Sequence, residues 1–151
     1  MGGRRRLHRG RPHRPHPQAA ADRRRTASNH LPGRNHPMNS DDLIRKYIEI
    51  WNERDATRRR ATIDAIFTED GVYSDPDWAA VEGRDAINLM IGQAREKLGD
   101  LTFGLGKVIN EHHDLMLFTW HLGQPGSPVA TGYDVARFEK GLIRRIDGFF
   151  V

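Results

Sequence analysis

Asp134 is the residue of this 151-residue chain whose type and position point most directly to chemistry. It lies in residues 131–139, where the alternation of side chains predicts a β-strand. Alternate side chains share a face, so Asp134 falls on the apolar face with Ala136 and Phe138. A buried carboxylate is costly unless it is paired, protonated or located in a cavity where it works. An ion pair with Arg84 or a histidine is the structural alternative to a functional role.

Two further polar side chains lie where burial is expected. Tyr47 is on the apolar face of a predicted helix, and Asp75 ends a short predicted strand directly before Pro76. Each also has an ordinary structural explanation. Asp75 could cap the turn at Pro76, and Tyr47 could be a core tyrosine that donates to a backbone carbonyl. The sequence alone leaves these alternatives open.

Three helices are predicted in the first half of the domain. Ser40 and the acids after it favour a helix start, and the apolar residues that follow recur at helical spacing up to Trp51. A second helix is expected over residues 57–67, with the run of arginines at 58–60 on its solvated face. A short strand at 72–75 and a loop carrying Trp78 precede a third helix that follows Gly83.

The pattern changes to strands after Asp100. Four alternating segments, residues 101–110, 115–122, 129–139 and 142–151, are separated by turn residues. The breaks at 124–128 and 140–141 have the composition of hairpin connections. Residues 38–151 are therefore expected to form one α+β domain, with three N-terminal helices packed on a curved antiparallel sheet in the shape of a cone.

Residues 1–37 differ from the rest in charge and composition. They hold ten arginines and one acid, a net charge of +9, whereas residues 38–151 carry −5. With few apolar side chains, the segment is expected to be a disordered basic extension, and Met38 is an alternative start of the protein. Nucleic acid would be a partner only through this extension. No apolar run has membrane-spanning length and the chain has no cysteine, which favours a cytoplasmic protein without membrane contact.

The order and spacing of several motifs resemble the SnoaL-like members of the NTF2-like superfamily. The motifs are residues 47–55, 67–76, 83–87 and 132–143. The resemblance covers nearly all of residues 40–151. It implies a curved-sheet cone with a pocket for a small apolar molecule, and a homodimer formed through the sheet.

The ketosteroid isomerases of that superfamily have polar residues at three matching positions. The resemblance implies that Asp75 is the base that moves a proton between carbons. It implies that Tyr47 and a protonated Asp134 donate hydrogen bonds to the enolate oxygen. The polyketide cyclases of the SnoaL group are a second enzymatic possibility, with Asp134 as the acid or base. A non-catalytic ligand-binding or dimerisation module is the alternative to both.

Apolar and aromatic side chains are expected to line the substrate pocket. The residues are Trp51, Trp78, Met116, Phe118, Trp120 and His113. Adjacent histidines such as His112 and His113 point to opposite faces of a strand, which disfavours a shared metal. No metal or other cofactor is expected.

Overall fold

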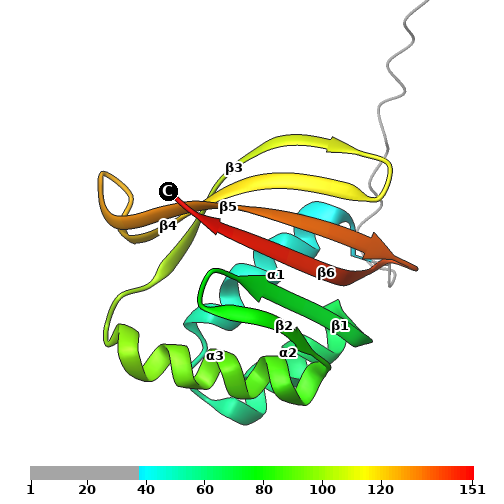
Figure 1. Cartoon of the computed structure of the whole chain (residues 1–151), viewed down its shortest axis with the longest axis horizontal. Helices are drawn as coiled ribbons and strands as arrows, with labels where there is room; N and C mark the ends of the chain where they lie inside the picture. The colour runs from blue at the N-terminus through cyan, green and yellow to red at the C-terminus, as the bar shows by residue number, and fades with distance from the viewer. Residues whose placement is uncertain (1–37) are drawn as a thin grey trace, which may run out of the picture. The chain divides into compact units, whose positions relative to one another are not determined.

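The computed structural model describes residues 38–151. The predicted basic extension, residues 1–37, lies outside the described residues. The described elements are helices α1 (Ser40–Asn52), α2 (Ala56–Ile66) and α3 (Arg84–Leu98), and strands β1 (Phe67–Asp75), β2 (Trp78–Glu82), β3 (Phe103–His112), β4 (Leu115–Gln124), β5 (Ser127–Glu139) and β6 (Leu142–Phe150) (Figure 1). The α+β class is as predicted, with α3 placed after β1 and β2.

The six strands form one sheet in the order β2-β1-β6-β5-β4-β3. Strands that are adjacent in both the sequence and the sheet pair in antiparallel fashion, but β1 pairs with β6 in parallel. The prediction of a wholly antiparallel sheet is therefore wrong at this pair. The chain leaves β1, passes through β2, α3 and three strands, and returns alongside β1 in the same direction. Parallel neighbours require such a crossover, which strand periodicity does not reveal.

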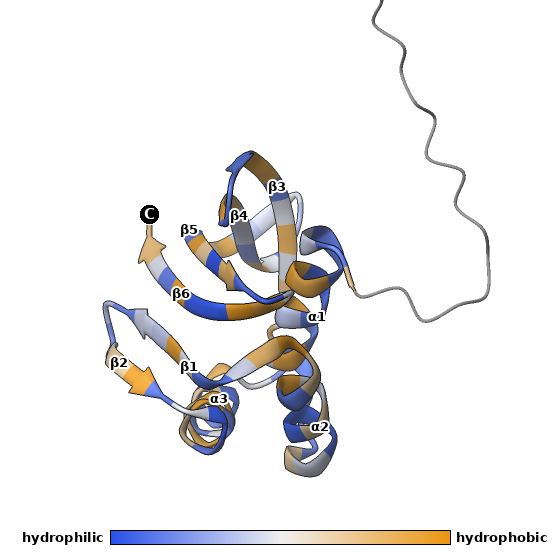
Figure 2. Cartoon of the chain, turned by 90° about the vertical axis from the view of Figure 1, so that its right-hand side faces the viewer, coloured by the Kyte–Doolittle hydropathy of each residue, from blue (hydrophilic) through white to orange (hydrophobic). Residues whose placement is uncertain are grey.

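The sheet curves from β3 and β4 round to β1 and β2, and the three helices lie on its inner side (Figure 2). The core fills the space between them. Its largest fully buried side chains include Tyr47 of α1, Phe67 of β1 and Phe118 of β4. The two phenylalanine rings meet Tyr47 edge-on, with centroids at 6.3 and 6.1 Å. This packing places α1 across the sheet and fixes where its polar side chains can reach.

The N-cap of helix α1 lies one residue earlier than predicted. Asn39 is the N-cap, and its side-chain oxygen accepts from the backbone N–H of Asp42 at 2.9 Å. The hydroxyl of Ser40, expected to be the cap, instead donates to Glu111 at 2.6 Å. The apolar face of α1 is buried as its periodicity predicts.

Two buried arginines hold the C-terminal end of α1. Arg59 of α2 donates to the carbonyl of Glu53 at 2.7 Å, and Arg95 of α3 donates to the carbonyl of Trp51 at 3.1 Å. Helix ends leave carbonyls without intrahelical partners and carry partial negative charge, so cations are favourable there. The expectation of a solvated arginine run is wrong for Arg59, which is only 3% exposed.

Strand β2 occupies a segment for which the sequence predicts a loop, because it is short and has no clear alternation. It forms by pairing with β1, where Tyr73 lies opposite Val81 and Asp75 lies opposite Trp78. This pairing brings the Trp78 ring to the same end of the sheet as Asp75. None of the helices described for residues 38–151 is long and apolar enough to cross a membrane.

Candidate active site

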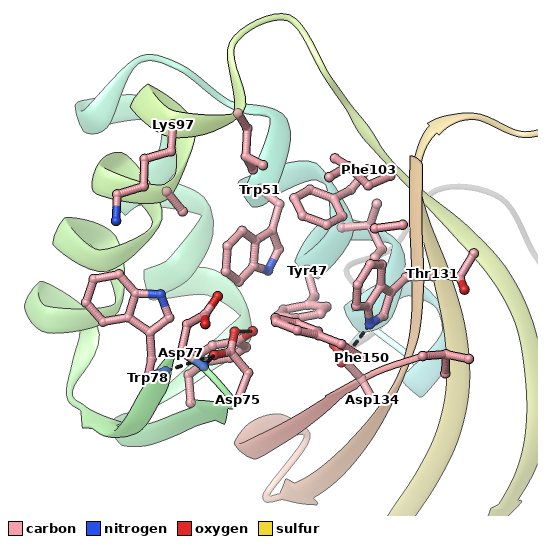
Figure 3. Close-up of a pocket in the computed structure, with 18 residues that line it drawn as sticks. Tyr47, Trp51, Asp75, Asp77, Trp78, Lys97, Phe103, Thr131, Asp134 and Phe150 are labelled. Atoms are coloured by element: carbon pink, nitrogen blue, oxygen red, sulfur yellow. Dashed lines mark hydrogen bonds between the residues drawn. The ribbon is translucent and has the colours of Figure 1, made fainter. Parts of the chain in front are cut away.

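A cavity of about 620 Å³ opens between the helices and the inner face of the sheet (Figure 3). Side chains from α1, α3 and all six strands contribute to its wall. Seven of them are aromatic: Tyr47, Trp51, Tyr73, Trp78, Phe103, Trp120 and Phe150. Asp75 and Asp134 also line it, and the exposed Asp77 and Lys97 add charge to the wall. The cavity thus combines apolar walls with a few polar groups, as small-molecule sites do.

Asp134 is buried at this wall, with 3% of its surface exposed. Its Oδ2 accepts a hydrogen bond from the Tyr47 hydroxyl at 2.8 Å, and its Oδ1 accepts one from the indole N–H of Trp120 at 3.0 Å. The three residues come from β5, α1 and β4. The strand face predicted for Asp134 is confirmed, since Ala136 beside it is also buried.

Among the described residues, no basic side chain forms an ion pair or hydrogen bond with Asp134, whose bonded partners are Tyr47 and Trp120. Arg84, one proposed ion-pair partner, instead donates to the backbone carbonyl of Phe67 at 2.6 and 3.1 Å. An ion pair therefore does not explain the buried acid. Hydrogen bonds from neutral donors stabilise a carboxylate far less than a full opposite charge does.

Burial raises the pKa of Asp134 to about 7. The hydrogen bonds from Tyr47 and Trp120 oppose this shift, while the nearby charges of Asp75 and Asp147 add to it. Burial and the charge of Asp134 raise the pKa of Tyr47 well above its ordinary value. Tyr47 is therefore a proton donor at all ordinary pH values, whereas Asp134 changes charge near neutrality.

Asp75 is half-buried and accepts three hydrogen bonds. Its Oδ1 accepts from the backbone N–H groups of Asp77 and Trp78 at 2.8 and 2.9 Å, and its Oδ2 accepts from the Tyr73 hydroxyl at 2.6 Å. The turn-capping explanation is thus correct for one oxygen. Because the same side chain lines the cavity, capping and a role in the site are compatible.

Tyr73 belongs to the site, although the sequence reasoning did not select it. It is buried, it lines the cavity, and burial raises its pKa above the ordinary tyrosine value. Its position two residues before Asp75 on a strand was the available signal, because residues i and i+2 share a face.

Gly148 of β6 is a second residue that the sequence reasoning missed. In the strand order β1-β6-β5, Gly148 lies opposite Asp134, and its neighbour Asp147 lies opposite Ser74. A Cβ at position 148 would lie 2.9 Å from Asp134 Oδ1 and 3.3 Å from Asp75 Cβ. The glycine therefore lets the two carboxyl side chains occupy adjoining space on the inner face. A glycine inside a predicted strand was the signal for such a close approach.

The predicted pocket residues divide into two groups. Trp51, Trp78 and Trp120 line the cavity, as do Tyr47, Asp75 and Asp134. Met116 and Phe118 do not line it. They share the inner face with Trp120 but lie earlier in β4, fully buried in the core. Alternation correctly assigned the face but gave no information on depth along the strand.

His113 is also outside the cavity, so its prediction as a pocket residue is wrong. It occupies the exposed turn between β3 and β4 with a positive φ of 53°, and its ring nitrogen lies 3.1 Å from that of His112. Within residues 38–151 no three histidine, aspartate or glutamate side chains are grouped to hold a metal ion.

The arrangement can perform acid–base chemistry on a bound carbonyl compound. Tyr47 and protonated Asp134 form a pair of O–H donors at one point of the wall. Asp75, on a different strand, is a separate carboxylate available as a base. Preformed donors stabilise a developing oxyanion, and a base must lie near it without occupying its place.

Comparison with known proteins matches residues 44–146 to the SnoaL-like domain. No curated protein matches the chain. A solved structure from Agrobacterium tumefaciens, described as a candidate isomerase of the SnoaL-like family, is 32% identical. That comparison covers 72% of this chain and 94% of the other, with a TM-score of 0.66.

Two other structures show the same fold at lower identity. An NTF2-like protein of unknown function from Cytophaga hutchinsonii is 14% identical, with 78% and 95% of the two chains covered and a TM-score of 0.58. A candidate ketosteroid isomerase from Kribbella flavida is 20% identical, with 72% and 75% covered and a TM-score of 0.56.

Proposed function

Because this chain belongs to the SnoaL-like domain family, we propose that its cavity catalyses proton transfer on an apolar carbonyl compound, as an isomerase does. One observation carries the proposal. The Tyr47 hydroxyl and the Asp134 carboxyl meet at 2.8 Å in the wall of an aromatic cavity that Asp75 also lines. The names of the Agrobacterium and Kribbella structures support an isomerase of this kind.

The proton transfer has three parts. The substrate is a ketone with a C=C bond between its β and γ carbons. Asp75 takes a proton from the α carbon, between that bond and the carbonyl group, and the electrons of the C–H bond pass into a conjugated enolate. Tyr47 and protonated Asp134 donate hydrogen bonds to the enolate oxygen. Protonated Asp75 then returns the proton to a different carbon, which moves the double bond and restores the carboxylate.

The rate contributions that are typical of one general base and two oxyanion donors together reach the range of enzymatic rate enhancements. A positioned general base contributes roughly 10²–10⁴-fold, and each donor to an oxyanion contributes about 10²–10³-fold. These donors act with most effect where water is excluded, and Tyr47 and Asp134 are themselves 2% and 3% exposed.

A phenol is the appropriate probe, because its hydroxyl oxygen resembles that of an enolate or enol. Binding of 2-naphthol, followed by its fluorescence, is expected to weaken on Tyr47→Phe or Asp134→Leu. Asp75→Asn is expected to preserve naphthol binding while abolishing deuterium exchange at the carbon next to the carbonyl of an apolar cyclic ketone. Asp77→Asn is the matched control, since that side chain lines the same cavity but bonds none of these three groups.

These readouts also separate enzyme from binding module. Naphthol binding without any ketone exchange would favour the non-catalytic ligand-binding module. Exchange that survives Asp75→Asn unchanged would overturn the assigned base. A polyketide cyclase would retain the requirement for Asp134, whereas the isomerase requires Asp75 as well.

The proposal includes a homodimer formed through the outer face of the sheet. Tyr133 and Phe149 pair across β5 and β6 and are 41% and 55% exposed. Adjacent exposed apolar side chains of this size favour burial against a protein surface. Phe149→Lys is expected to shift the sedimentation coefficient from dimer to monomer. A wild-type protein that sediments as a monomer at micromolar concentration would overturn this part of the proposal.

A further inference from the structure

Trp120 makes a contact with Asp134 that depends on a glycine of the neighbouring strand. In the β4–β5 register Trp120 lies opposite Gly132, two residues before Asp134. A Cβ at position 132 would collide with the Trp120 ring and with the backbone carbonyl of Phe149. Only the absence of that side chain lets the indole lie over β5 and direct its N–H to Asp134 Oδ1.

The indole nitrogen has a single role in hydrogen bonding. It donates and has no lone pair with which to accept. The oxygen that faces it must therefore remain an acceptor whether Asp134 is charged or neutral. When Asp134 is neutral, its proton is then held on the other oxygen, Oδ2, which is the oxygen beside the Tyr47 hydroxyl.

We propose that Trp120 is a positioning residue that holds the proton of neutral Asp134 on Oδ2, next to Tyr47, where it can be donated into the cavity. The catalytic consequence rests on the proposed function. The placement of the proton rests only on the two hydrogen bonds of the carboxyl group and on the close approach at Gly132.

Counting protons shows why this placement matters. When Asp134 is charged, its two oxygens accept the O–H of Tyr47 and the N–H of Trp120, and no O–H proton is left for a ligand. When Asp134 is neutral, the pair of Tyr47 and Asp134 Oδ2 holds two O–H protons but needs only one for its mutual hydrogen bond. The second can point to an oxygen in the cavity. A proton on Oδ1 would compete with the indole instead.

Other groups near Asp134 affect its titration but cannot replace this contact. They are Tyr47 on α1, Tyr73 and Asp75 on β1, and Asp147 on β6. Asp75 and Asp147 are negative and raise the pKa of Asp134, whereas the Trp120 N–H lowers it. Removing the indole N–H is therefore expected to make Asp134 hold its proton to higher pH.

The test titrates the Asp134 carboxyl itself in the full-length protein. Its infrared C=O band, identified by its loss in Asp134→Asn, is followed against pH. In Trp120→Phe the midpoint is expected to rise by about one pH unit, the size expected for one lost hydrogen bond to a charged acceptor. Trp78→Phe, which removes an indole of the same cavity whose ring N–H does not contact Asp134, is expected to leave the midpoint unchanged.

A binding measurement at pH 5.5 tests the orientation of the proton separately. At this pH Asp134 is neutral in both proteins, so a change in its pKa has no effect. Trp120→Phe is expected to weaken 2-naphthol binding by about tenfold, the equivalent of one net hydrogen bond. Gly132→Ala keeps the indole but displaces it. Like Trp120→Phe, it is expected to raise the infrared midpoint and to weaken naphthol binding.

An unchanged midpoint in Trp120→Phe would overturn the inference. So would a raised midpoint with full naphthol affinity at pH 5.5, since the proton would then be placed correctly without the indole. The infrared titration needs no turnover. A raised midpoint in a protein without isomerase activity would thus leave the positioning role standing and remove only the proposed function.

Discussion

The hydroxyl of Tyr47 lies 2.8 Å from Oδ2 of Asp134, although 87 residues separate the two in the chain. Helix α1 supplies the hydroxyl and strand β5 supplies the carboxyl. Both side chains are buried, at 2% and 3% exposed, so bulk solvent has little access to either. The pair therefore couples the packing of the helix on the sheet to the charge state of the cavity wall.

The charge state of Asp134 is expected to make stability depend on pH. Its pKa is about 7 in the folded protein and near 3.8 when exposed, so the unfolded chain loses the proton first. The folded state accordingly loses stability as pH rises from about 4 to 7, by up to about 4 kcal/mol. Urea unfolding of wild type and Asp134→Asn at pH 5 and pH 9 checks this. Residue 134 of the variant is neutral at both pH values, so the variant is expected to be more stable relative to wild type at pH 9 than at pH 5. An equal difference in the free energy of unfolding at both pH values would contradict this prediction.

Replacing Asp75 with asparagine is expected to lower kcat for ketone isomerisation by roughly 10²–10⁴-fold, since an amide cannot take up the proton. The asparagine side chain retains an oxygen that can accept from the backbone N–H groups of Asp77 and Trp78, so the fold is expected to persist. Circular dichroism and steady-state kinetic assays measure the two effects. Asp77→Asn is expected to keep near wild-type kcat.

Tyr73→Phe tests whether the hydroxyl that contacts Asp75 orients the base. The change removes a 2.6 Å hydrogen bond but keeps the ring, which packs against Trp51 at a centroid distance of 5.3 Å. We expect kcat to fall by about tenfold with KM nearly unchanged, as for the loss of one hydrogen bond that acts on the chemical step. A rise in KM alone would assign Tyr73 to substrate binding.

Gly148→Ala tests the close approach between the strands of the two carboxyl groups. The added methyl would lie 2.9 Å from Asp134 Oδ1, closer than van der Waals contact permits. Asp134 must then move, and we expect 2-naphthol binding to weaken by at least tenfold. Gly126→Ala, where a Cβ meets nothing within 4 Å, is the matched control. Equal affinities in the two variants would show that the carboxyl adjusts freely.

Arg95→Met is expected to destabilise the domain by about 3 kcal/mol without a direct effect on the cavity chemistry. The guanidinium donates to three backbone carbonyls, those of Trp51, Gly99 and Leu101, and only 4% of the residue is exposed. Its loss removes the donor to the buried carbonyl of Trp51 and two further hydrogen bonds that hold the end of α3. Thermal or urea unfolding measures the change, and the exposed Arg58→Met is expected to stay within about 0.5 kcal/mol of wild type.

Periodicity in the sequence was sufficient for the class of the fold and for the inward face of Asp134. Helical spacing from Leu43 to Trp51 and alternation around Asp134 are local properties, and local sterics determine which side chains share a face. The resemblance in motif order identified the family that the comparisons support. Local patterns did not reveal the parallel pairing of β1 with β6 or the short strand β2, because both depend on pairing with β1.

In the candidate site, too, local patterns predicted some features and the packing of distant elements decided the others. The sequence by itself determined that Tyr47, Asp75 and Asp134 are polar groups on faces expected to be buried. Only the tertiary structure decided that Tyr47 donates to Asp134, that Tyr73 and Gly148 join the site, and that Met116, Phe118 and His113 lie outside the cavity. The physical reason is that periodicity specifies only the direction in which a side chain points from the axis of its helix or strand. Depth along a strand and contact across strands depend on how the elements pack, which distant residues set.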